Sequence, residues 1–163
     1  MFPDDILEAA RSVIQAAQAR GLTIATAESC TGGLVAAALT AVPGSSAVMD
    51  RGFVTYSNTA KAQMLGVAED LISQHGAVSE PVARSMADGA EEHSGAQVTV
   101  SITGIAGPGG GSAEKPVGLV HFAANGPAGQ VHAERRFGDI GRDGIRADSV
   151  RVALALLLDR LSD

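Results

Sequence analysis

Predicted helices and strands alternate along the chain, and this order constrains the fold more than any other feature. Helical periodicity is clear over residues 3–20, where apolar side chains recur on one stripe before Gly21. Further helices are expected over residues 30–41, 58–65, 79–94 and 143–162, and strands over residues 22–27, 47–56, 97–103, 117–124 and 129–137. The NGPAG turn makes the last two strands an antiparallel hairpin. The order therefore predicts an α/β layered fold with a mixed sheet.

Composition limits the class of protein. A length of 163 residues suits one domain, which we expect to span residues 1–163, and 45% apolar with 18% charged residues predicts a globular chain. The net charge of −6 argues against a sequence-independent grip on nucleic acid. No apolar run reaches the length of a membrane span, and the N-terminus lacks the pattern of a signal peptide. The single cysteine allows no intrachain disulfide, so we expect a reducing, cytoplasmic setting.

The sequence shows no pattern for a metal or another cofactor. The four histidines are scattered and lack the spacing of metal ligands: His75, His93, His121 and His132. Glu28 and Asp50 are acids for which the sequence suggests no partner. We therefore expect neither a metal nor a cofactor.

The segment AESCTGG places polar and reactive side chains where a strand is expected to pass into a helix. A helix N-terminus offers unpaired N–H groups, and adjacent glycines allow a ligand to approach the backbone. Ser29 at this junction could be a nucleophile, with Gly32 and Gly33 beside a developing oxyanion. Alternatively, Ser29 is only a helix cap and the glycines serve packing. Cys30 is the rival nucleophile, but a lone cysteine is most often a buried apolar residue, and we expect it in the core.

Tyr56 and Lys61 form a second candidate pair. Tyr56 is the only tyrosine in the chain, and Lys61 follows it by five residues. A desolvated lysine has a lowered pKa and can act as a base. The alternative is a surface lysine with a tyrosine at the rim of a pocket.

A glycine-rich loop follows the expected strand 97–103 in the segment SITGIAGPGGG. Its backbone N–H groups could surround an anion, and Thr103 lies at the carboxyl end of the strand. The loop does not match a Walker A motif or a dinucleotide fingerprint. It could also be a plain loop or a flexible lid. Arg142 and Arg146, four residues apart, suit a phosphate or a carboxylate, although a solvated charged face is the common alternative.

Taken together, these segments resemble the CinA C-terminal domain family of nicotinamide mononucleotide amidohydrolases. The matching stretches are AESCTGGL, PGSS, the pattern from Gly52 to Lys61, GAVSE, TGIAGPGGG, KPVG and the arginine segment. The resemblance implies a three-layer α/β/α sandwich with a mixed, mostly parallel sheet. It also implies a cytoplasmic homodimer that hydrolyses nicotinamide mononucleotide to nicotinate mononucleotide and ammonia.

The resemblance further implies roles for individual residues. Ser29 would be the nucleophile, with Lys61 and Tyr56 in its proton network. The residues implied to bind the nucleotide are Thr31, Gly32, Gly33, Ser46, Thr103, Gly104, Gly107, Gly109, Gly110, Arg142 and Arg146. In this mechanism Lys61 takes the serine proton directly or through Tyr56, and N–H groups at the helix start stabilise the oxyanion. The alternative is a non-catalytic module that binds a nucleotide, or a competence- or DNA-damage-associated module that binds a protein partner.

Overall fold

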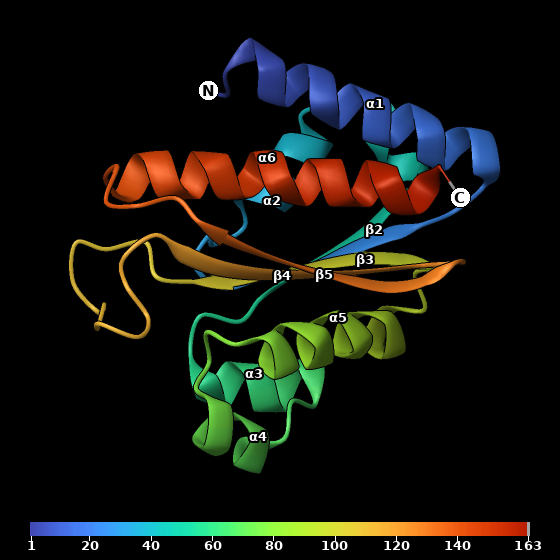
Figure 1. Cartoon of the computed structure of the whole chain (residues 1–163). Coiled ribbons are helices and arrows are strands. Elements are labelled where there is room, and N and C mark those ends of the chain that lie inside the picture. Colours follow the sequence, from blue (N-terminus) through green and yellow to red (C-terminus); the bar gives the residue numbers. More distant parts are fainter. Residues whose placement is uncertain (163) are drawn as a thin grey trace.

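The computed structural model describes residues 1–162, which form a central sheet between two layers of helices (Figure 1). On one face lie α1 (Asp4–Arg20), α2 (Leu34–Thr40) and α6 (Arg142–Leu161). On the other face lie α3 (Asn58–Leu65), α4 (Glu69–His75) and α5 (Glu80–Ser94). This arrangement confirms the predicted three-layer α/β/α sandwich.

The sheet has five strands in the order β2-β1-β3-β4-β5. Their bounds are β1 Ile24–Glu28, β2 Met49–Val54, β3 Val98–Gly104, β4 Leu119–Gly126 and β5 Gly129–Arg136. Strand β1 pairs in parallel with β2 and β3, whereas β4 pairs antiparallel with β3 and with β5. Four strands thus share one direction and β4 alone opposes them, which confirms a mixed, mostly parallel sheet.

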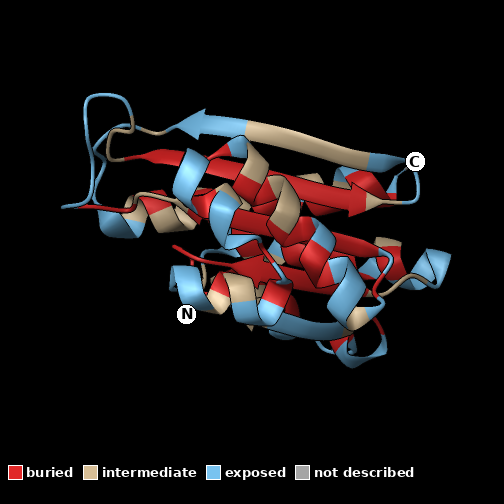
Figure 2. Cartoon of the chain, turned by 90° about the horizontal axis from the view of Figure 1, so that it is seen from below, coloured by how far each residue is buried: buried red, intermediate tan, exposed pale blue. Residues whose placement is uncertain are grey.

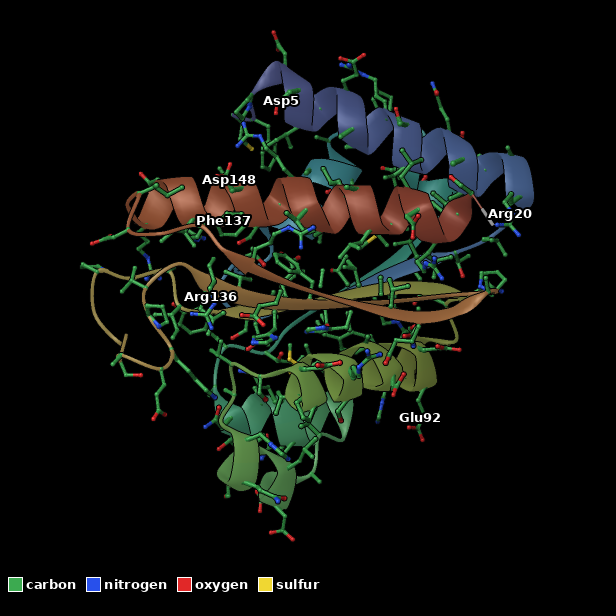
Figure 3. All side chains as sticks on the ribbon, viewed as in Figure 1. Asp5, Arg20, Glu92, Arg136, Phe137 and Asp148 are labelled. Carbon is green, nitrogen blue, oxygen red and sulfur yellow. The ribbon has the colours of Figure 1, made fainter. Side chains whose placement is uncertain are left out.

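The main core lies between the sheet and the layer of α1, α2 and α6. It is built from aliphatic side chains with a single fully buried aromatic ring, Phe122. Figure 2 shows the buried residues concentrated in the strands and on the helix faces turned toward them. Arg20 joins the end of α1 to the carbonyl of Leu161 at 2.9 Å, and Arg151 of α6 bonds both Asp5 and Asp148. Figure 3 labels Asp5 and Arg20 on α1 and Asp148 on α6, which packs against α1. None of the helices in residues 1–162 is long and apolar enough to cross a membrane.

The second core positions α3 against α5. Buried apolar side chains of α3, α4 and α5 meet there, among them Leu65, Ile72 and Met86. Gly89 of α5 permits this approach, because a Cβ at that position would lie 2.0 Å from the carbonyl oxygen of Leu65. The helix that carries Lys61 is therefore fixed closely against its neighbour.

Two elements differ from the expectation. Helix α2 begins at Leu34, four residues later than expected, because Gly32 and Gly33 have φ values of 58° and 104°, which helical residues do not adopt. Helix α4 was not expected, and its seven residues are too few to show a periodic pattern.

Candidate active site

A pocket of about 240 Å³ opens at the carboxyl ends of β1 and β3, the edge at which parallel α/β sheets bind ligands. Its lining comes from the turn after β1, the segment after β2, the loop after β3 and the start of α6. The lining residues are Ser29, Cys30, Tyr56, Gly104, Ile105, Ala106, Gly107, Gly109, Gly110 and Arg142. The sheet register brings these segments together, because Glu28 pairs with both Val54 and Ile102. The loop between β3 and β4 projects beyond the left end of the sheet in Figure 1.

Ser29 and Lys61 meet at this edge. Lys61 Nζ donates to Ser29 Oγ at 3.1 Å and to the carbonyl oxygen of Thr55, also at 3.1 Å. Lys61 is only 2% exposed, and Ser29 is 9% exposed where it faces the pocket. Desolvation by burial lowers the pKa of Lys61 from its ordinary value of 10.5. The two side chains therefore have the contact and the electrostatic setting of a nucleophile and a base.

The turn that carries Ser29 is not the helix start that the sequence suggested. Strand β1 ends at Glu28, and the buried carboxylate of Glu28 accepts the N–H groups of Val35 and Ala36 at 2.9 and 3.0 Å. These donors at the start of α2 are already occupied, so they do not stabilise an oxyanion in the pocket. The amides of Cys30, Thr31 and Gly33 have no hydrogen-bond partner within residues 1–162, so an oxyanion site at the Ser29–Gly33 turn itself stays a prediction.

Cys30 lies in the core, as the sequence predicted. It is 6% exposed and belongs to the main core. Burial raises the pKa of its thiol to about 11, so the thiol stays protonated near neutral pH. Neither Ser29 nor Cys30 lies in a helix, and both line the pocket.

Tyr56 and Arg142 meet in the lining of the same pocket. Arg142 Nη2 donates to the Tyr56 hydroxyl at 2.9 Å, and Arg142 Nη1 donates to the carbonyl oxygen of Gly107 at 2.7 Å. Tyr56 is 61% exposed. Within residues 1–162, the Tyr56 hydroxyl bonds to neither Ser29 nor Lys61. Arg142 thus joins the segment after β2 to the glycine-rich loop across the pocket.

The glycine-rich loop supplies backbone to the pocket. Its base is closed by bonds from Ile105 N to Leu119 O and from Gly118 N to Ile105 O. Gly107 and Gly110 have φ values of 77° and 86°, which favour glycine. Within residues 1–162, the amides of Ala106, Gly107, Gly109 and Gly110 have no hydrogen-bond partner. Together with the amide of Cys30, which also lines the pocket and has no partner within these residues, these N–H groups are available donors beside the pocket.

Several residues implied by the resemblance lie elsewhere. Thr103 is buried, and its hydroxyl donates to the carbonyl oxygen of Ala77 at 2.9 Å. Ser46 is exposed in the short 3₁₀ turn Ser45–Ala47 before β2, at the opposite edge of the sheet. Arg146 bonds the backbone of the Ser29 turn rather than facing the pocket. Thr31, Gly32 and Gly33 form that turn but are not part of the pocket lining.

Comparison with known proteins identifies the family of this chain. The model of the CinA C-terminal domain matches residues 7–161. The chain belongs to the CinA C-terminal domain family. This CinA-family chain is 51% identical over 157 residues to the nicotinamide-nucleotide amidohydrolase PncC of Escherichia coli K12, covering 96% of this chain and 95% of that protein.

Other CinA relatives are longer or have solved structures. A CinA-like protein of Anaeromyxobacter sp. strain K is 54% identical over 146 residues, which are 89% of this chain but 35% of that protein. The chain thus spans about a third of the length of several curated relatives it matches. The crystal structure of the competence/damage inducible protein CihA from Agrobacterium tumefaciens has a TM-score of 0.97 at 55% identity, covering 100% and 99% of the two chains.

Two features of this CinA-family site could not be found by sequence reasoning. Glu28 lacked a visible partner, because the amides that it binds lie seven and eight residues away across a turn. The pocket also uses Ile105 and Ala106, whose apolar side chains carry no chemical signal. Among residues 1–162, no group of three or more His, Cys, Asp or Glu side chains is placed to hold a metal ion.

Proposed function

We propose that this chain hydrolyses the carboxamide of nicotinamide mononucleotide to nicotinate mononucleotide and ammonia. The observation that carries the proposal is the contact between the buried Lys61 Nζ and Ser29 Oγ at the floor of an open pocket. The amidohydrolase named among the relatives, which is matched over nearly its whole length, supplies the substrate class.

The proposed reaction begins with neutral Lys61. As the Ser29 oxygen attacks the carboxamide carbon, its proton passes directly to Lys61 Nζ. The carbonyl oxygen becomes an oxyanion, for which the unpaired N–H groups of Ala106 and Gly107 are the proposed donors. The carbon–nitrogen bond then breaks, and the Lys61 ammonium returns the proton to the departing ammonia.

Water completes the proposed cycle. Lys61 removes a proton from the water that attacks the acyl ester, and the Ser29 oxygen leaves with that proton. This sequence is a serine–lysine variant of triad chemistry. We assign Tyr56 to substrate binding, since its hydroxyl accepts from Arg142, and its part in the proton network stays a prediction.

The other end of the nucleotide requires a site for its phosphate. We assign this role to Arg142 and the amides of Gly109 and Gly110, which line the same pocket. A planar guanidinium with nearby N–H groups suits a phosphate that carries two negative charges. Assembly into a homodimer remains a prediction that rests on the resemblance, and light scattering of the purified chain would test it.

The test is ammonia release from nicotinamide mononucleotide. We expect turnover in the wild type, none above background in Ser29→Ala, and wild-type turnover in the matched control Ser12→Ala, whose hydroxyl bonds only Glu8 on α1. Binding of the nucleotide without ammonia release would favour a non-catalytic nucleotide-binding module. Absence of both binding and turnover would favour a module that binds a protein partner.

A further inference from the structure

The turn from Ser29 to Gly33 contains few bonds that define its own shape. Ser29 N donates to Ile102 O at 2.9 Å, Gly32 N donates to Ser29 O at 3.0 Å, and Leu34 N donates to Thr31 O at 3.1 Å. Two adjacent glycines with positive φ follow. Because glycine has more accessible backbone conformations than any other residue, such a turn needs external contacts to keep one conformation. Side chains from outside the turn supply them.

Arg146 of α6 contacts the turn through its carbonyl groups. Its Nε donates to Cys30 O at 3.1 Å, and its Nη2 lies 3.4 Å from Thr31 O. A Cβ on Gly32 would lie 3.5 Å from the same Nη2, so the guanidinium packs over the turn. Arg146 is half-buried and is not among the residues that line the Ser29 pocket. Two nitrogen atoms of its guanidinium are therefore directed at backbone carbonyls of the turn.

Glu28 holds the other end of the same connection. Its side chain is 1% exposed. Val35 N donates to its Oε1 atom, and Ala36 N donates to its Oε2 atom. Thr26 Oγ1 lies 3.4 Å from a carboxylate oxygen as a third, longer contact. Hydrogen bonds from backbone N–H groups to a buried carboxylate are among the stronger ones in proteins. Glu28 therefore fastens the start of α2 to the end of β1, with the turn between them.

We infer that Glu28 and Arg146 are positioning residues, which hold the Ser29 turn by its backbone and keep Ser29 Oγ within reach of Lys61 Nζ. Their charges match the groups they bind, since the carboxylate takes N–H donors and the guanidinium takes carbonyl acceptors. The kinetic part of this inference rests on the proposed function. The structural part, that these side chains restrain the turn, is independent of it.

The two roles open to Arg146 have opposite kinetic signatures. A guanidinium that bound the substrate phosphate would support the ground state and the transition state alike, so its loss would raise KM. A guanidinium that holds the nucleophile's turn acts on alignment, and its loss lowers kcat with KM nearly unchanged. A small displacement of a reacting group can cost ~10²-fold in rate.

The kinetic experiment compares Arg146→Ala, Arg146→Lys and Glu28→Gln with the charge control Arg11→Ala, an exposed residue of α1. With nicotinamide mononucleotide, we expect kcat to fall ~10²-fold in Arg146→Ala, with KM within about threefold of the wild type. Arg146→Lys should be intermediate, because one ammonium replaces the fork of the guanidinium, and Glu28→Gln should also lower kcat. A raised KM at wild-type kcat in Arg146→Ala would overturn the inference, as would wild-type values of both.

A second measurement needs no catalysis. We expect amide hydrogen exchange in residues 29–36 to accelerate at least about tenfold in Arg146→Ala and Glu28→Gln, while exchange in β4 stays as in the wild type. Unchanged exchange over residues 29–36 would overturn the inference. If the wild type released no ammonia, the proposed function would fail, and hydrogen exchange alone would decide whether these side chains hold the turn. If Glu28→Gln did not fold, the two Arg146 variants would still decide it.

Discussion

Two glycine-containing connections leave the same edge of the sheet, and they are built in opposite ways. The Ser29 turn after β1 is five residues long, mostly buried, and bonded by Glu28 and Arg146. The loop after β3 is longer and largely exposed from Pro108 to Glu114, and Arg142 reaches it only at Gly107. We infer a division between the two connections, in which the restrained turn carries the proposed nucleophile and the open loop binds the substrate.

The largest effect should come from substituting Lys61, the proposed base, which contacts Ser29 of the restrained turn. Lys61→Arg should lose ~10³-fold in kcat, because arginine keeps its proton and cannot accept one from Ser29. The wild-type rate should rise with pH, with a midpoint below that of an ordinary lysine, since burial lowers the pKa of Lys61. Rates of both proteins between about pH 6 and pH 10 provide the measurement.

Lys115→Arg is the matched control for that change. Lys115 bonds the carbonyl of His75 outside the pocket, so this variant should keep the wild-type rate and pH profile. Strong activity in Lys61→Arg with the rising limb intact would exclude Lys61 as the base.

Substitution of Arg142 tests whether the pocket wall beside the glycine-rich loop binds the substrate. Arg142→Ala should raise KM for nicotinamide mononucleotide about tenfold, because a charged hydrogen bond to the phosphate is worth roughly one factor of ten or more. Its kcat should stay within about threefold of the wild type, since the guanidinium bonds Tyr56 and Gly107 and neither Ser29 nor Lys61. A fall in kcat at constant KM would place Arg142 with the chemistry, and the proposed division would be wrong.

A pair of glycine substitutions compares the two connections directly. Gly32→Ala forces a side chain into φ 58° and should cost about 1–2 kcal/mol in unfolding free energy, together with part of kcat. Gly109→Ala adds a Cβ with no atom within 4 Å, so its unfolding free energy should stay within about 0.5 kcal/mol of the wild type. Urea unfolding of both variants is the measurement. Equal losses would show that the two connections are equally restrained.

Much of the fold could be predicted from periodicity alone. The ends of α1, α3, α5 and α6 lie within one or two residues of the expected positions, because each of these helices has a clear apolar face or a terminal signal. The start of α2 could not be predicted. Glu28 bonds the first turn of the helix from across the turn, and the positive φ values of Gly32 and Gly33 prevent the helix from beginning before Leu34.

The candidate site was predictable only in part, for a related reason. The sequence marked Ser29 and Lys61 separately, but their contact spans 32 residues and depends on the parallel pairing of β1 with β2. Arg142 and Arg146 look equivalent in sequence, yet one lines the pocket and the other bonds a turn 116 residues away. Side-chain direction at a helix start is decided by packing, which spacing alone does not describe.

The smallest expected effect concerns stability and pH. Burial lowers the pKa of Lys61 from 10.5, so between the lowered value and 10.5 the unfolded chain holds a proton that the folded protein does not. Stability contributed by this group therefore increases as the pH rises through that interval. Cys30 has the opposite slope above about pH 9, because its pKa is raised to about 11, and the charge of Lys61 is one of the influences on that pKa. Urea unfolding of the wild type and Lys61→Met is therefore compared at pH 7 and pH 9, below the range in which the folded Cys30 titrates. The wild type should gain more unfolding free energy than Lys61→Met over this range. Equal gains would mean that Lys61 titrates as an exposed lysine does. Lys61 would then lack the neutral form that the proposed mechanism requires.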